Sequence, residues 1–135
     1  MHITIDRRKL FKTQAYSIIL IFILNTIAVK FDFYSSIWYF DMIMHFLGGF
    51  WLGLAFLWLF SYKNSSLELF FALIFKIILS VLIIGVLWEI FEIIFINIIA
   101  KNPFNTLDSL SDIFFDLSGS SFVIIFFLKK FVCVT

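Results

Sequence analysis

A set of ionisable side chains recurs at helical spacing inside apolar stretches of the sequence. They form three blocks, D-x3-H, E-x2-E and D-x3-D-x3-D, and side chains three or four positions apart share one face of a helix. Carboxylate oxygens together with an imidazole nitrogen can bind one or two divalent cations. The residues of these blocks are Asp41, His45, Glu89, Glu92, Asp108, Asp112 and Asp116.

The chemistry of this set predicts a divalent-metal site. Its many carboxylate oxygens favour Mg²⁺, Mn²⁺ or Ca²⁺ over Zn²⁺, for which a second imidazole would be the better ligand. Two such cations about 4 Å apart could clamp a phosphoryl group and activate water. The expected catalytic group is His45 with Asp41 or Asp108, which would orient the imidazole or act as a base. The expected metal ligands are His45, Glu89, Glu92, Asp112 and Asp116.

The chain that carries these residues has the composition of an integral membrane protein. Of its 135 residues, 63% are hydrophobic and 14% are charged, whereas about 25% are charged in a soluble domain. Apolar runs long enough to cross a bilayer recur along the chain. The net charge of +1 argues against a nucleic-acid partner. The single cysteine argues against a disulfide framework or a cysteine-based metal site.

The pattern predicts an all-α fold, a bundle of four transmembrane helices in a single domain over 1–135. The third apolar stretch contains Lys76, which we interpret as the inner boundary of that span, and 67–75 as a helical extension at the membrane surface. Pro103 is expected to stop this helix. The expected spans cover 15–29, 37–60, 76–100 and 107–128.

The basic residues predict the orientation of the four spans. Most of them fall on one side, and the positive-inside rule makes that side cytoplasmic. We therefore expect a multi-pass protein of the cell membrane with both termini in the cytoplasm. The residues on the expected cytoplasmic side are Arg7, Arg8, Lys9, Lys12, Lys63, Lys129 and Lys130, and those on the other side are Lys30 and Lys101.

The three acidic blocks are expected to meet in the extracytoplasmic half of the bundle. A rise of 1.5 Å per residue places all three at matching heights, roughly 20 to 30 Å from the cytoplasmic ends of their spans. No Lys or Arg shares these faces, so the acids must be protonated, line a water-filled cavity or bind metal ions. Asp41 and Asp108, at the edge, could instead reach interfacial water, and Asp108 could cap the last helix. His45 could be structural, but the face that it shares with Asp41 favours a site.

Three segments of the chain resemble blocks of a known family. They read YFDMIMHFLGG, GVLWEIFEIIF and DSLSDIFFDLSG, and resemble in this order the D-x3-H, E-x2-E and D-x3-D blocks of the YjdF-like membrane proteins. They resemble more distantly the VanZ-like proteins, small multi-span bacterial membrane proteins, one of which is linked to teicoplanin resistance. Glu92 and Asp116 stand where VanZ-like chains usually carry Gln and Asn, and the upstream Arg of those chains is absent. The positions shared with both patterns are Asp41, His45, Glu89, Asp112 and Gly119.

Two classes of function fit these observations. The first is a metal-dependent membrane hydrolase or transferase that acts on a lipid phosphate or an isoprenoid-carrier phosphate, because the site lies just below the outer headgroups. The second is a proton- or cation-coupled transporter, since stacked carboxylates also relay protons and cations in membranes. A transporter would need a second polar site in the inner half, which a homo-oligomer could supply. A small subunit of a larger membrane complex is a further possibility. Membrane lipid is the expected partner.

Overall fold

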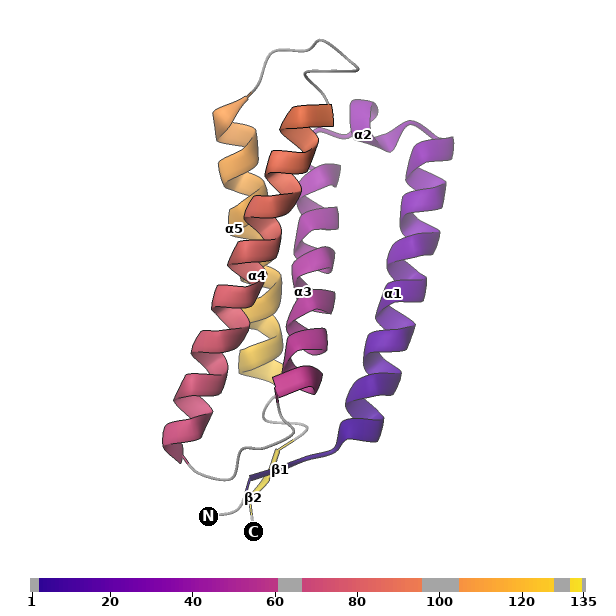
Figure 1. Cartoon of the computed structure of the whole chain (residues 1–135). Coiled ribbons are helices and arrows are strands. Elements are labelled where there is room, and N and C mark those ends of the chain that lie inside the picture. Colours follow the sequence, from indigo (N-terminus) through magenta and orange to yellow (C-terminus); the bar gives the residue numbers. More distant parts are fainter. Residues whose placement is uncertain (1–2, 61–66, 96–104, 128–131, 135) are drawn as a thin grey trace.

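The computed structural model describes residues 3–60, 67–95, 105–127 and 132–134, and the side chains of 6–60, 71–95 and 105–127. Its long helices run in alternating directions, so that the chain leaves the end that carries both termini in the first helix and returns to it in the last (Figure 1). The elements are β1 (Ile3–Ile5), α1 (Arg7–Lys30), α2 (Phe33–Ser36), α3 (Phe40–Phe60), α4 (Leu67–Phe95), α5 (Thr106–Phe122), a π-helical turn η3 (Val123–Phe127) and β2 (Val132–Val134).

Four of these helices are long and apolar enough to cross a membrane. This confirms the predicted helical membrane bundle with four spans. The common position of both termini at one end of the bundle follows from the even number of spans, and the assignment of that end to the cytoplasm stays a prediction. The spans are Arg7–Lys30, Phe40–Phe60, Phe71–Phe95 and Thr106–Phe126.

The structure differs from the expected boundaries in two places. Helix α4 begins at Leu67 and continues through Lys76, as expected of a helical extension over 67–75, but the stretch that is long and apolar enough to cross a membrane begins at Phe71, before Lys76. A single charge does not interrupt a helix, because its long side chain can reach toward the interface while its backbone stays hydrogen-bonded. The segment expected to be a loop between the first two spans contains the short helix α2. Further residues used for the boundaries and the orientation lie outside the described residues: Lys63, Lys101, Pro103, Lys129 and Lys130.

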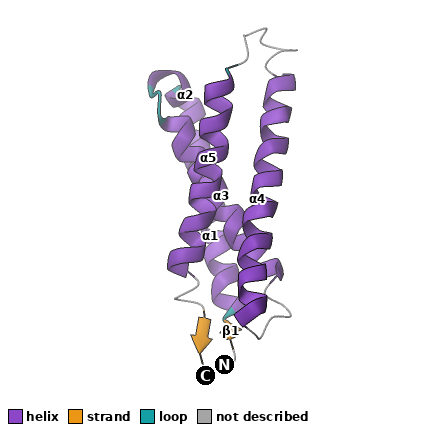
Figure 2. Ribbon diagram, turned by 90° about the vertical axis from the view of Figure 1, so that its left-hand side faces the viewer, coloured by secondary structure: helices purple, strands orange, loops and turns teal. Residues whose placement is uncertain are grey.

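The two ends of the chain pair with each other. Strands β1 and β2 are antiparallel, with Ile3 opposite Val134 and Ile5 opposite Val132. They lie beyond the helix ends, on the side of the bundle that carries the termini (Figure 2). This pair could not be predicted from the sequence, because three residues are too few to display a period of two.

Local capping fixes where the first and last spans begin. Asp6 caps α1, since its Oδ1 accepts a hydrogen bond from the backbone N–H of Lys9 at 3.1 Å. Asn105 caps α5 and accepts from the N–H of Leu107 at 3.2 Å. The capping role considered for Asp108 therefore belongs to Asn105, and Asp108 lies in the first turn, where a negative charge favours the helix dipole.

Glycines allow α3 and α5 to approach each other closely. A Cβ atom at Gly49 would clash with the backbone carbonyl of Asp116, and one at Gly119 would clash with the carbonyl of Phe46. Small residues at such a crossing let two helix backbones touch. Because the contact lies one turn from His45 on α3 and directly at Asp116 on α5, it also sets the distance between these two side chains.

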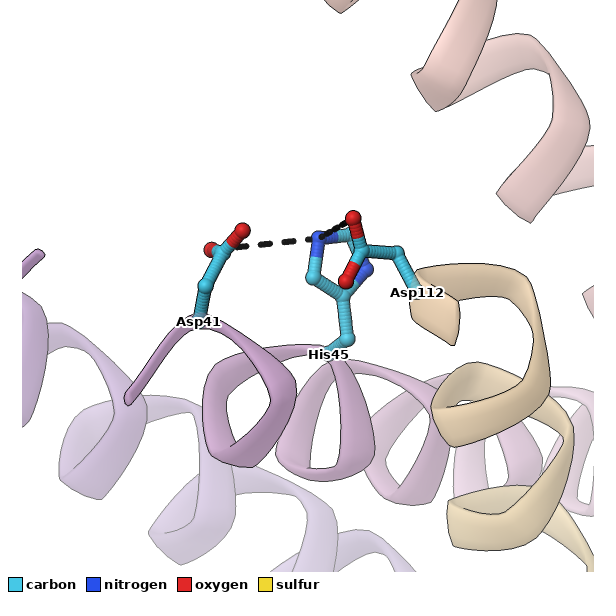
Figure 3. A group of neighbouring side chains, drawn as sticks. All are labelled: Asp41, His45 and Asp112. Carbon is cyan, nitrogen blue, oxygen red and sulfur yellow. Dashed lines mark ion pairs between the residues drawn. The ribbon is translucent and has the colours of Figure 1, made fainter. Parts of the chain in front are cut away.

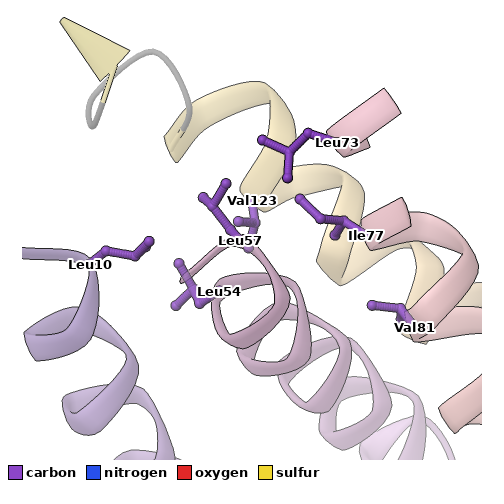
Figure 4. Packing of buried hydrophobic residues seen from close by; sticks show 7 residues of the cluster. All are labelled: Leu10, Leu54, Leu57, Leu73, Ile77, Val81 and Val123. Atoms are coloured by element: carbon purple, nitrogen blue, oxygen red, sulfur yellow. The ribbon is translucent and has the colours of Figure 1, made fainter. Parts of the chain in front are cut away.

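Buried apolar side chains fill the half of the bundle nearer the termini (Figure 4). They come from all four spans and occupy the parts of each helix that lie away from the acidic blocks. The bundle is therefore divided along its length into an apolar half and a polar half. The apolar cluster consists of Leu10, Leu54, Leu57, Leu73, Ile77, Val81 and Val123.

Candidate metal centre

His45 lies at the centre of the polar half, with its imidazole ring between carboxylates of two helices. Its Nδ1 atom is 3.4 Å from Oδ1 of Asp116. Its Nε2 atom is 3.9 Å from Oδ2 of Asp112 and 4.0 Å from Oδ1 of Asp41. Figure 3 shows the imidazole of His45 between Asp41, one turn earlier on α3, and Asp112, which projects from α5. Both ring nitrogens thus face acids.

The acids of α4 reach the same imidazole. The residues form two overlapping groups, in each of which one potential ligand atom per residue lies within 4.8 Å of the others. One group contains Asp41, His45 and Asp112, and the other contains His45, Glu89 and Glu92. The three sequence blocks, from three different helices, therefore meet at His45.

Burial distinguishes the inner members of this set from the outer ones. His45, Glu89, Asp112 and Asp116 are each less than 8% exposed. The Oε1 atom of Glu89 is buried and has no hydrogen-bond partner among the described residues. A buried polar atom without a partner costs about 1–3 kcal/mol, and more when it is charged. A buried carboxylate oxygen without a hydrogen-bond partner, close to His45 and Glu92, is the arrangement expected of a ligand to a cation.

The charges of the cluster are unbalanced within the described part of the chain. The ion pairs of Asp41, Asp112 and Asp116 there are all made with His45. One imidazolium cannot neutralise several carboxylates, and uncompensated charge at bilayer depth is costly. The set therefore fits a bound divalent cation in its charge as well as in its ligand atoms.

Asp108 is not part of either group. It lies in the exposed first turn of α5, one turn away from Asp112 and toward the end of the helix. Its spacing placed it correctly on the acidic face of the helix, but the helix end carries it beyond the reach of His45. Of the residues proposed from the sequence, it is the one that the structure leaves outside the contacts of the cluster.

Tyr34 of α2 lies near the cluster and was not found from the sequence. Its hydroxyl donates a hydrogen bond to Oδ1 of Asn25 on α1 at 2.8 Å. Partial burial raises the pKa of Tyr34 above its ordinary value, and the negative charges of Asp41 and Glu92 raise it further. These charges act on the phenol only because α2 lies beside the acidic end of the bundle. A lone tyrosine in a loop carries no spacing signal that could have revealed this.

A family model of predicted membrane proteins, DUF2238, matches residues 1–131. The chain belongs to this family. The YjdF-like proteins are the DUF2238 family, so that resemblance is confirmed, whereas the more distant VanZ-like resemblance finds no support. No curated protein and no solved structure matches the chain.

A cavity of about 420 Å³ lies beside the cluster in this DUF2238 protein. Helices α1, α3 and α4 form most of its wall, and α5 contributes Asp116. Acids and His45 line one part of it, while most of its surface is apolar. The polar residues in its wall are Asp41, His45, Glu92 and Asp116.

Proposed function

We propose that this protein binds a divalent cation at His45 and is a membrane enzyme that acts on the phosphate of a lipid or of an isoprenoid carrier. The observation that carries the proposal is the convergence of carboxylates from three helices on one imidazole, where the buried Oε1 of Glu89 has no hydrogen-bond partner in the described part of the chain. The oxygen-rich ligand set favours Mg²⁺, Mn²⁺ or Ca²⁺ over Zn²⁺.

The distances suggest a role for each ring nitrogen of His45. Asp116 faces Nδ1 and would hold the ring in place, as acids do for many metal-binding histidines. Nε2 would then face the cation together with Asp112 and Asp41. This assignment differs from the sequence hypothesis, in which Asp41 or Asp108 oriented the ring and Asp116 bound metal.

The remaining acids complete the proposed site. Glu89 and Glu92 would supply carboxylate oxygens from α4. The side chain of Asp41 is 41% exposed, so it is the acid of the His45–Asp112 group with access to water, and we assign it the role of base. A bound cation would contribute charge stabilisation at a phosphoryl oxygen and a lowered pKa of its bound water.

The apolar half of the bundle favours an enzyme over a transporter. A proton or cation that crossed the membrane would have to pass the apolar cluster around Leu57, Ile77 and Val81, whose side chains offer it no ligand. The site instead includes one exposed acid, Asp41, whose side chain is 41% exposed, and it borders the cavity. Association with a second copy or with a larger membrane complex stays a prediction.

Metal analysis of the purified protein in a mild detergent tests the proposal. Protein dialysed against Mn²⁺ and then washed is expected to retain at least one ion per chain, and added Mn²⁺ is expected to raise the melting temperature of the metal-free protein. If washed protein retains no ion, and Mn²⁺, Mg²⁺ and Ca²⁺ all leave the melting temperature unchanged, the proposed function is wrong.

A further inference from the structure

The wall of the cavity beside the metal centre includes residues that also face the bilayer. Ile18 of α1 and Ile84 and Trp88 of α4 line the cavity and are at the same time 41%, 39% and 51% exposed. These residues belong to membrane spans, so lipid chains cover their exposed surfaces. The cavity wall is therefore continuous with the lipid-facing surface of α1 and α4.

The polar and apolar parts of this wall are separated along the bundle. Asp41, His45 and Glu92 contribute its acidic end. Leu52 lies about 10 Å beyond His45 along α3, and Ile84 lies about 12 Å beyond Glu92 along α4. An occupant whose anionic head binds the cation at His45 therefore has hydrocarbon beside the part that follows the head.

The volume of the cavity limits how much of a lipid it can enclose. It is about 420 Å³, in the lower part of the range of about 300–1,000 Å³ that is usual for a site that encloses one drug-sized molecule. A membrane lipid is larger than such a molecule, so the cavity can hold its head and only the first part of its chain. The rest of the chain has to continue into the bilayer, past the exposed lining residues of α1 and α4.

The apolar part of the wall also restricts the chemistry of that first part. Ile18, Leu52 and Ile84 have pure hydrocarbon side chains, and the indole nitrogen of Trp51 is itself buried, so it is not offered to an occupant. The carboxylates at the other end are hydrogen-bond acceptors when they are ionised. A hydrogen-bond acceptor that moves from water to a place between acids and hydrocarbon loses its donors, which weakens binding.

This wall distinguishes between the two kinds of phosphate that the proposed function admits. A glycerolipid has ester carbonyls a few bonds from its phosphate, and these acceptors would lie between the acids and the hydrocarbon of the wall. An isoprenoid phosphate has only hydrocarbon after its phosphate, and it has one chain where the glycerolipid has two. The isoprenoid phosphate therefore suits both the apolar wall and the small volume.

We propose that the cavity selects an isoprenoid-carrier phosphate over a glycerolipid. The phosphate binds at the His45 centre, the first isoprene units lie against the apolar wall, and the remaining chain stays in the bilayer beside α1 and α4. The proposal rests on the proposed function, because the cation at His45 is what attracts the phosphate. It adds the hydrocarbon wall as the feature that determines which phosphate the protein accepts.

Native mass spectrometry of the Mn²⁺-loaded protein tests the selection, with undecaprenyl phosphate and dioleoylphosphatidic acid as probes. The wild type is expected to bind undecaprenyl phosphate at least about tenfold more tightly, the effect of one buried acceptor without a donor. Ile84→Asn adds an amide N–H to the wall that can satisfy a carbonyl, and is expected to reduce this preference about 2- to 10-fold. Ile83→Asn makes the same change at the neighbouring exposed position outside the cavity wall, and is expected to keep the preference.

The outcomes separate this proposal from the one on which it rests. Retention of Mn²⁺ by both variants shows first that the metal centre is intact in them. Equal or tighter binding of phosphatidic acid by the wild type would overturn the selection, and so would equal effects of the two substitutions. If the wild type retains Mn²⁺ but binds neither probe, the selection is wrong and the metal centre stands. If the wild type does not retain Mn²⁺, the proposed function itself fails, and this inference fails with it.

Discussion

Nδ1 of His45 and Oδ1 of Asp116 lie 3.4 Å apart, across the contact between α3 and α5. If Asp116 holds the imidazole in place, Asp116→Ala should weaken Mn²⁺ binding by about 10- to 100-fold, the usual effect of removing such a partner. Asp116→Asn should restore most of the affinity, since its amide oxygen can still accept a hydrogen bond from Nδ1. Calorimetric titration with Mn²⁺ measures both variants. Equal losses in the two would make Asp116 a metal ligand instead.

The acids in the two groups around His45 should differ from Asp108 in their effect on bound metal. Glu89→Gln combined with Asp112→Asn removes one carboxylate from each group and should weaken binding by more than about tenfold. Asp108→Asn changes an acid of the same helical face that lies outside both groups, and should leave the bound metal unchanged. Elemental analysis of the washed proteins compares them. A loss of metal in Asp108→Asn equal to that in the double variant would contradict the arrangement of the site.

Two adjacent glycines of α3 should respond differently to the same substitution. A Cβ at Gly49 would clash with the backbone of Asp116, whereas a Cβ at Gly48 would lie 3.9 Å from Oδ1 of Asp116, an ordinary contact. Gly49→Ala should therefore lower the stability by at least about 1–3 kcal/mol, and Gly48→Ala should leave it nearly unchanged. Thermal unfolding in detergent is the measurement. Similar melting temperatures for the two variants would show that α3 and α5 are not in backbone contact.

The titration of Tyr34 should report the charge of the nearby acids. The pKa of Tyr34 in the folded protein is raised above its ordinary value of 10.0. The folded state therefore holds the phenol proton more tightly than the unfolded state does, and this contribution to stability is lost as the pH rises from 10.0 through the pKa of the folded protein. Asp41→Asn should lower the pKa of Tyr34, because one of the negative charges that raise it is removed. Asp108→Asn should not change it. Ultraviolet absorbance between pH 8 and 12, as the difference from Tyr34→Phe, isolates this tyrosine, and a Tyr34 that titrates at or below pH 10 would contradict its place beside the acids.

The orientation in the membrane can be measured at two described positions. In a Cys133→Ser background, a membrane-impermeant maleimide should label Trp38→Cys from outside intact cells, because Trp38 is 79% exposed at the α2 end. Asp6→Cys, at the end with the termini, should react only after the membrane is permeabilised. The reverse labelling pattern would place both termini outside the cell and would contradict the orientation predicted by the positive-inside rule.

The spacing of the acidic residues was enough to predict that they meet, but not how they contact each other. Periodicity fixes which side chains share a helix face, and the constant rise per residue fixes their height, so the convergence on His45 could be foreseen. Which carboxylate faces Nδ1 and which faces Nε2 depends on the rotation and the closeness of α3 and α5. Those are set by the packing of Gly49 and Gly119, which the sequence marks only as small residues.

Features that depend on contacts distant in sequence were missed for a related reason. Tyr34 approaches the acids only because α2 folds over the end of the bundle. Helix α4 could be foreseen on both sides of Lys76, but the start of its apolar span at Phe71 could not, since the same charge is typical of a span end and of a snorkelling side chain.

The pairing of β1 with β2 imposes an order on the synthesis of the protein. Strand β1 leaves the ribosome before all of the spans, and its partner β2 leaves after them. Few residues of helix α1 are buried. The helix is tied at one end by this strand pair and near the other by the hydrogen bond between Tyr34 and Asn25. The first of these ties cannot form during insertion of the earlier helices. The strand pair can therefore help to hold the wall that α1 contributes to the cavity only after the last span has left the ribosome.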